Sequence, residues 1–166
     1  LFLHAYIPEG WRATDSRPGI VFFFGGGWAD GHATHFARHA SYLAGRGMVA
    51  LCADYRVSSR HSVLLDQCVE DAKSAIRWVR SHHAILGIDP QRIVGAGGSS
   101  GGHIAACSGM IDGFEAVGDD LSVSSVPDAM VLFNAVLDLT IPPVELTRRM
   151  SHVLHRHLQR AVDMQS

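Results

Sequence analysis

Cysteines are scarce in this sequence, and their spacing is wide and irregular. The 166 residues include only Cys52, Cys68 and Cys107. Neither a disulfide framework nor a CxxC metal site fits this arrangement. We therefore expect a reduced chain in the cytoplasm. Because the chain begins at Leu1 and not at Met, a lost leader, and with it secretion, is the alternative.

An excess of charge of one sign is absent as well. Fourteen Lys and Arg stand against sixteen Asp and Glu, which gives a net charge of -2. Without a basic field, the chain is expected to bind neither nucleic acid nor an anionic membrane surface. No apolar run reaches the roughly 18 residues that a membrane-spanning helix needs, so we expect no membrane span either.

Metal-ligand motifs are also missing, although the chain contains 11 histidines. The sequence has no HExxH motif and no His or Cys pair at ligand spacing. His32, His35 and His39 fall on a predicted loop and helix, whereas His82 and His83 lie near a predicted helix end. We expect neither a bound metal nor a cofactor.

The residues that are present predict one α/β domain over residues 1–166. Hydrophobic residues make up 47% of the chain, and no repeat or Pro/Ser-rich linker divides it. After a β-rich segment at 2–7, continuous apolar runs predict buried strands at 19–24, 48–53, 92–96 and 129–137. Helical spacing predicts helices at 36–46, 63–86 and 103–111. Such alternation is typical of a parallel sheet covered by helices on both faces.

The segment Gly97-Gly98-Ser99-Ser100-Gly101 fits the nucleophile elbow G-x-S-x-G, and it lies between a predicted strand and a predicted helix. So sharp a turn needs small residues two positions before and after the serine. The helix amino terminus would favour a developing anion. Ser99 is the predicted nucleophile, and a register shifted by one residue makes Ser100 the alternative. A phosphate-binding turn is less favoured, because neither G-x-G-x-x-G nor G-K-[ST] is present.

A second glycine cluster, Gly25-Gly26-Gly27-Trp28, follows the first predicted buried strand. In enzymes with a nucleophile elbow, this loop supplies backbone N–H groups to the oxyanion hole. Three consecutive glycines are weak evidence by themselves, because they also occur in flexible turns. Together with a nucleophile elbow about seventy residues later, however, they strongly indicate an oxyanion hole.

These clusters, together with Asp54-Tyr55-Arg56, Asp71-Ala72 and Gly87-Ile88-Asp89-Pro90, resemble the α/β-hydrolase carboxylesterases related to hormone-sensitive lipase, including bacterial acetyl esterases. The resemblance covers about residues 1–141. It implies a serine carboxylic-ester hydrolase that acts on small acyl esters through an acyl-enzyme.

The resemblance also implies roles for individual residues. Ser99 would be the nucleophile, and the N–H groups of Gly26, Gly27 and Ser100 would form the oxyanion hole. Trp28 would wall the substrate pocket, with simple packing as the alternative. The sequence departs from the family at Phe24, where His is frequent, and at Ser100, where Ala is usual.

The family's catalytic Asp and His are not found in their usual setting. They follow the nucleophile in later loops, the His often in a Gly-His-Gly-Phe-like motif that this chain lacks. At about 30 residues per βα unit, 166 residues hold about five units, whereas the complete sheet needs about 240 residues. We expect an incomplete domain, ending near the sixth strand of the family, with a divergent amphipathic tail over 142–166.

Two alternatives follow from the missing residues. Asp138 with His152, His155 or His157 could complete a triad, although solvated histidines on an arginine-rich helix are the more favoured interpretation. The chain could also be a catalytically inactive α/β-hydrolase-like module that associates with itself, as a homo-oligomer, or that binds a partner.

Other polar residues are expected to be structural. Asp54 and Arg56 should pair or bond to loop backbone near the site. The charged positions of the long helix should form a solvated face, and Cys107 should be a small core residue. That face would consist of Asp71, Lys73, Arg77 and Arg80.

Overall fold

A computed structural model describes residues 1–140 of the chain. The predicted amphipathic tail lies outside this range, as do His152, His155 and His157. The described part contains both glycine clusters and every strand and helix predicted before residue 138.

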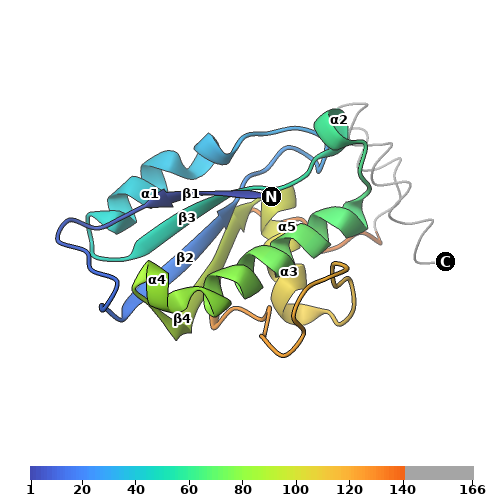
Figure 1. Cartoon of the computed structure of the whole chain (residues 1–166). Helices are drawn as coiled ribbons and strands as arrows, with labels where there is room; N and C mark the ends of the chain where they lie inside the picture. Colours follow the sequence, from blue (N-terminus) through green and yellow to red (C-terminus); the bar gives the residue numbers. More distant parts are fainter. Residues whose placement is uncertain (141–166) are drawn as a thin grey trace.

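Five strands form a single sheet in the described part (Figure 1). They are β1 (Phe2–Tyr6), β2 (Arg17–Phe23), β3 (Val49–Asp54), β4 (Ile88–Gly98) and β5 (Ala129–Phe133). Their order across the sheet is β1-β3-β2-β4-β5. β1 pairs antiparallel with β3, whereas the other neighbouring pairs are parallel. The predicted α/β fold is therefore confirmed, and the predicted parallel sheet is found in β2, β3, β4 and β5, whereas the antiparallel edge strand β1 departs from it.

Helices cover both faces of this sheet (Figure 1). The helix α1 lies on one face, and α3 and α5 lie on the other. Among the helices of residues 1–140, none is both long and apolar enough to cross a membrane. The helical elements are η1 (Ala33–Phe36), α1 (Ala37–Ala44), α2 (Ser58–His61), α3 (Leu65–Ser81), α4 (His83–Leu86) and α5 (Ser100–Met110).

The central strand β2 contributes to two cores, one on each face of the sheet. Ile20 and Phe22 pack with residues of η1 and α1, whereas Val21 and Phe23 pack in the larger core under α3 and α5. Successive strand side chains point to opposite faces, so a strand covered on both faces is apolar at every position. This explains the continuous apolar run in the sequence.

Two predicted elements are interrupted or end early in the structure, whereas the others differ only in where their ends fall. The helix predicted over 63–86 begins only at Leu65, because Leu64 has extended backbone with a φ of -95° and a ψ of 176°, and it is divided at His82 into α3 and α4. Gly87, with a φ of 63°, ends α4 as the left-handed cap that the sequence predicts. The strand predicted over 129–137 ends at Phe133, because Asn134 has a φ of 45°.

The prediction of a solvated charged face on α3 is wrong. Lys73 and Arg77 are buried, with exposed fractions of 2% and 6%. The Lys73 ammonium donates to Glu115 at 2.9 Å, and Arg77 donates to Glu115 and Asp119 at 2.7 Å each. These carboxylates belong to the loop between α5 and β5, so buried ion pairs hold this loop against α3.

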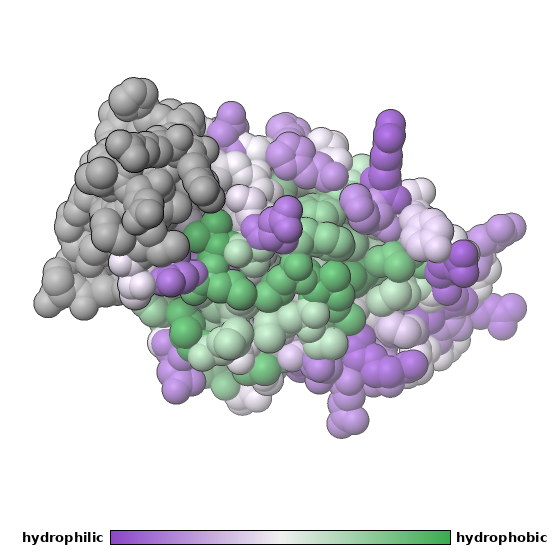
Figure 2. Space-filling model, turned by 180° about the vertical axis from the view of Figure 1, so that it is seen from behind, coloured by the Kyte–Doolittle hydropathy of each residue, from purple (hydrophilic) through white to green (hydrophobic). Residues whose placement is uncertain are grey.

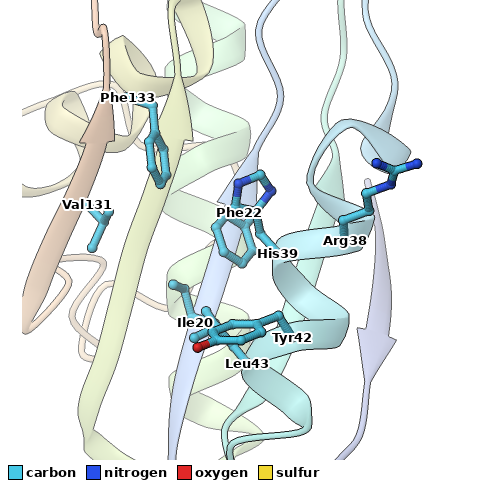
Figure 3. A pocket seen from close by; sticks show the side chains of 8 residues that line it. All are labelled: Ile20, Phe22, Arg38, His39, Tyr42, Leu43, Val131 and Phe133. Carbon is cyan, nitrogen blue, oxygen red and sulfur yellow. The ribbon is translucent and has the colours of Figure 1, made fainter.

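The α1 face of the sheet is covered only in part. Figure 2 shows a broad hydrophobic surface on this side, and Figure 3 shows apolar side chains of β2, β5 and α1 around a groove of about 500 Å³. The edge strand β5 leaves Val131 and Phe133 about two-fifths exposed, at 43% and 42%. The groove is lined by Ile20, Phe22, Arg38, His39, Tyr42, Leu43, Val131 and Phe133.

The first turn of α5 lies directly against the end of β2. A methyl group on Gly101 would overlap the carbonyl oxygens of Phe23 and Phe24. A methyl group on Gly97, in β4, would overlap the carbonyl of Gly101. The small residues that the sequence predicts on both sides of Ser99 are therefore required by close backbone packing.

His103 packs inside the helical layer next to this turn. Its ring meets the Trp28 ring edge to face at 5.2 Å, and its Nε2 lies 3.5 Å from the Cys107 sulfur. Burial lowers the pKa of the His103 imidazole from 6.5 to about 4. His103 is therefore a neutral core residue at pH 7, and Cys107 occupies the buried position that the sequence predicts.

Replacement of Gly101 by Ala should destabilise the fold, because the added methyl group forces α5 away from β2. We expect the free energy of unfolding to fall by about 2 kcal/mol or more. Gly45→Ala is the matched control, since Gly45 has a φ of -62° and its added methyl group would meet nothing closer than 3.4 Å. Urea unfolding followed by circular dichroism measures both variants, and an equal effect would contradict the packing argument.

Acidification from pH 7 to pH 5 should weaken the fold through His103. The folded-state pKa of about 4 lies below the unfolded value of 6.5, so the unfolded chain binds the extra proton and stability falls as pH drops. At pH 5 the proton bound by His103 in the unfolded chain lowers the free energy of unfolding by about 2 kcal/mol. Urea unfolding at both pH values should show a smaller loss in His103→Gln than in the unaltered chain. Equal losses would mean that other groups cause the effect.

Candidate active site

Ser99 occupies the turn between β4 and α5, as the sequence predicts. Its backbone has a φ of 53° and a ψ of -122°, a combination that residues with a side chain rarely adopt. The Ser99 N–H donates to the Phe133 carbonyl at 2.9 Å, and the Ser99 carbonyl accepts the His103 N–H at 3.0 Å. The end of β5 and the first turn of α5 thus hold this strained conformation.

The glycine loop after β2 lies against the same turn. A methyl group on Gly25 would lie 3.2 Å from Ser99 Cβ and 2.9 Å from the Gly98 carbonyl. Gly26 and Gly27 have φ values of 144° and 63°, which favour glycine at both positions. The structure therefore brings together two glycine clusters that lie about seventy residues apart in the sequence.

The two adjacent serines differ in burial. Ser99 is half-buried, whereas Ser100 is fully buried at 0% exposure. Within residues 1–140, the Ser100 hydroxyl has no hydrogen-bond partner. A reacting hydroxyl needs access to its substrate, so the burial favours Ser99.

Trp28 lies in the glycine loop and is buried. Its exposed fraction is 1%, and its ring packs on His103. Within the described residues, its indole N–H has no hydrogen-bond partner. The Trp28 side chain is thus a packed residue, which is the alternative interpretation from the sequence. Contact between Trp28 and a substrate stays a prediction.

No imidazole of the first 140 residues hydrogen-bonds to the Ser99 hydroxyl. The nearest histidine in sequence, His103, bonds to Cys107 instead. Asp138 is exposed, and its carboxylate accepts the backbone N–H of Thr140 at 2.8 Å. The Thr140 hydroxyl, which also donates to this carboxylate, lowers the pKa of Asp138. A partnership of Asp138 with a tail histidine falls outside the described residues and stays a prediction.

Asp54, the last residue of β3, does not pair with Arg56 in the loop that follows. Arg56 instead bonds to Asp71 of α3, with 2.7 Å between Nη2 and Oδ1. Asp54 pairs with Arg60 at 2.9 Å. Both pairs fix the loop after β3. Sequence reasoning missed the residue between them, Tyr55, whose hydroxyl reaches the glycine loop; its place in a family-like motif was the available signal.

No three side chains of the metal-binding types come together in the part of the chain that the structure describes. Burial raises the pKa of the Cys107 thiol to about 11 and that of the Cys52 thiol to about 11. These thiols stay protonated at pH 7, so the structure gives neither cysteine the thiolate that a nucleophile or a metal ligand needs. Burial raises the pKa of the third thiol, Cys68, as well, so Ser99 and none of the three cysteines is the candidate nucleophile.

Comparison with known proteins finds esterases that are similar to this chain. The BD-FAE family model matches residues 3–164. The chain is 37% identical over 93 residues to the carboxylesterase NlhH of Mycobacterium tuberculosis, a match that covers 55% of this chain and 28% of that protein. It is 36% identical over 106 residues to the probable isoprenylcysteine alpha-carbonyl methylesterase ICMEL1 of Arabidopsis thaliana, covering 64% of this chain and 21% of that protein.

Solved structures give the same result. The apo form of Thermogutta terrifontis esterase 2 matches with a TM-score of 0.84 and 50% identity, covering 93% of this chain and 56% of that one. The chain thus spans about half the length of this esterase and about a quarter of the curated relatives. With the family model matching nearly all of its length, the chain belongs to the BD-FAE family, among the α/β-hydrolase esterases related to hormone-sensitive lipase.

Proposed function

We propose that the chain is the nucleophile-bearing part of a serine carboxylic-ester hydrolase that acts on small acyl esters such as acetyl esters. The observation that carries the proposal is the position of Ser99. It is half-buried on a left-handed turn at the start of α5, directly beside the glycine loop after β2. Strained backbone at such a position is typical of nucleophile elbows.

The proposed reaction proceeds through an acyl-enzyme. Ser99 Oγ attacks the ester carbonyl carbon, its proton passes to a general base and then to the leaving alcohol, and water releases the acid in a second step. The carbonyl oxygen becomes an oxyanion held by the N–H groups of Gly26, Gly27 and Ser100. The Ser100 N–H belongs to the first turn of α5, where helix N–H groups lack partners within the helix.

The relatives support a short acyl group. Structures of Thermogutta terrifontis esterase 2 hold propionate or butyrate, and another is phosphorylated by paraoxon. That esterase is 49 to 51% identical to this chain in the propionate and butyrate structures. We propose that this chain contributes to a site for acyl groups of similar size.

We further propose that the general base and its carboxylate come from sequence beyond Ser166. Two observations support this. No histidine of residues 1–140 bonds to the Ser99 hydroxyl, since His103, the nearest in sequence, bonds to Cys107. The matched esterase is almost twice as long as the matched region of this chain. Asp138 with His152, His155 or His157 is the alternative source.

Hydrolysis of p-nitrophenyl acetate tests the role of Ser99. We expect the 166-residue chain to turn over this ester very slowly, because a serine without its base is a weak nucleophile. A chimera that continues residues 1–140 with the remainder of Thermogutta terrifontis esterase 2 should be active. Ser99→Ala should lower its kcat by about 10⁴-fold or more, and Ser100→Ala should keep most of the activity.

The contrary outcomes separate the alternatives. Rapid Ser99-dependent turnover by the 166-residue chain would place the base within it and support Asp138 with a tail histidine. An active chimera that loses its activity in Ser100→Ala but not in Ser99→Ala would identify Ser100 as the nucleophile. Equal turnover by the chain and its Ser99→Ala variant, together with an inactive but folded chimera, would support the inactive module.

A further inference from the structure

The loop after β3 and the short helix α2 that follows it hold the glycine loop after β2. Four hydrogen bonds from residues 55–60 reach backbone carbonyls of residues 24–31. They are Tyr55 Oη to Phe24 at 2.7 Å, Ser58 N to Trp28 at 3.1 Å, Ser59 N to Ala29 at 3.0 Å and Arg60 Nη2 to Gly31 at 3.3 Å. Gly25, Gly26 and Gly27, which include two of the proposed oxyanion donors, lie between the first and second of these anchors.

The Tyr55 bond is the one anchor that precedes the three glycines. Its acceptor, the Phe24 carbonyl, belongs to the residue directly before Gly25, and the Phe24 and Tyr55 rings stack with centroids 4.2 Å apart. Tyr55 is fully buried at 0% exposure. Water therefore does not compete for this hydrogen bond, which fixes the carbonyl more firmly than an exposed bond would.

The Phe24 carbonyl also lies where the two halves of the proposed oxyanion hole meet. It packs directly against Gly101, in the first turn of α5, at the point where a methyl group would overlap it. Burial raises the pKa of Tyr55, and the nearby Ser100 hydroxyl opposes this effect, although it forms no hydrogen bond of normal geometry. Tyr55 thus contacts both the glycine loop and the turn that carries Ser99.

Tyr55 itself has little freedom to move. Its ring meets the Phe23 ring edge on at 6.4 Å. The next residue, Arg56, is held by Asp71, which accepts both the Arg56 backbone N–H at 2.8 Å and its guanidinium. The Cys68 thiol bonds to the Arg56 carbonyl at 3.2 Å. Since Asp71 and Cys68 belong to α3, the helix fixes the position from which the Tyr55 hydroxyl reaches Phe24.

Burial raises the pKa of the Tyr55 hydroxyl far above its ordinary value. The hydroxyl therefore keeps its proton, and its ability to donate to Phe24, across the pH range in which esterases are assayed. The hydrogen bond is a permanent part of the loop and does not switch with pH.

We propose that Tyr55 is a positioning residue for the oxyanion hole. Its hydroxyl fixes the Phe24 carbonyl and thereby holds the N–H groups of Gly26 and Gly27 opposite the N–H of Ser100. The proposal rests on the proposed esterase function, because it assigns Tyr55 a role at that site. Tyr55 touches neither substrate nor reacting atoms and acts only through the loop.

Tyr55→Phe tests the proposal because it keeps the stacked ring and removes only the hydroxyl. Tyr42→Phe is the matched control, since Tyr42 lies on α1 with 60% of its surface exposed. The slow turnover of p-nitrophenyl acetate by the 166-residue chain is a suitable readout, because activity without the full triad comes from the oxyanion hole and binding. We expect Tyr55→Phe to lower kcat about 10- to 100-fold, with KM changed less than about twofold, since complete loss of one donor costs about 10² to 10³.

Amide hydrogen exchange of residues 24–31 gives a second readout that does not depend on activity. We expect exchange in this loop to be about tenfold faster in Tyr55→Phe, with β4 and the middle of α3 unaffected and Tyr42→Phe matching the unaltered chain. Unchanged exchange in the loop would overturn the proposal. Faster exchange with unchanged kcat would overturn it too, because Tyr55 would then serve loop stability alone.

The two proposals can fail separately. If the unaltered chain hydrolyses the ester no faster than its Ser99→Ala variant and the folded chimera is inactive, the esterase function fails, and loop exchange alone decides whether Tyr55 fixes the glycine loop. If Ser99-dependent turnover is present and Tyr55→Phe retains all of it, the esterase function stands and the role of Tyr55 falls.

Discussion

The close approach between the first turn of α5 and the end of β2 is the contact on which the rest of the site depends. At Gly101 the helix backbone packs on the carbonyl oxygens of Phe23 and Phe24, with no room for a side chain. This contact forces the chain to leave β4 in a sharp turn, which gives Ser99 its left-handed backbone, and it places Gly25 against Ser99. The same Phe24 carbonyl accepts a hydrogen bond from the Tyr55 hydroxyl. The backbone at the end of β2 therefore contacts the first turn of α5 and the loop after β3.

The sequence predicts the sheet and the Ser99 turn because both leave direct chemical traces. A strand covered on both faces must be apolar at every position, and the run Ile20 to Phe24 shows this. A turn in which backbone meets backbone excludes side chains, and Gly97 and Gly101 show that exclusion. Both constraints limit the residue type at a given position, so they can be predicted from the sequence even when the packing partners are not known.

Long-range partners leave weaker traces. Helical spacing places Lys73 and Arg77 away from the sheet, which makes them look solvated, but the loop after α5 returns over them with Glu115 and Asp119. The role of Tyr55 is hidden in the same way, because its acceptor is a backbone carbonyl 31 residues earlier. Every residue carries a backbone carbonyl, so the residue type at the acceptor position gives no sign of the hydrogen bond. The end of β5 at Asn134 depends on a φ of 45°, which the asparagine side chain permits but does not demand.

A crystal structure of the chimera of residues 1–140 with the remainder of Thermogutta terrifontis esterase 2, after reaction with an alkyl p-nitrophenyl phosphonate, tests the central claim most directly. The claim predicts phosphorus bonded to Ser99 Oγ, with its phosphoryl oxygen about 2.7 to 3.1 Å from the backbone nitrogens of Gly26 and Ser100. Phosphorus on Ser100, or on Ser99 with the phosphoryl oxygen directed away from the glycine loop, would contradict it.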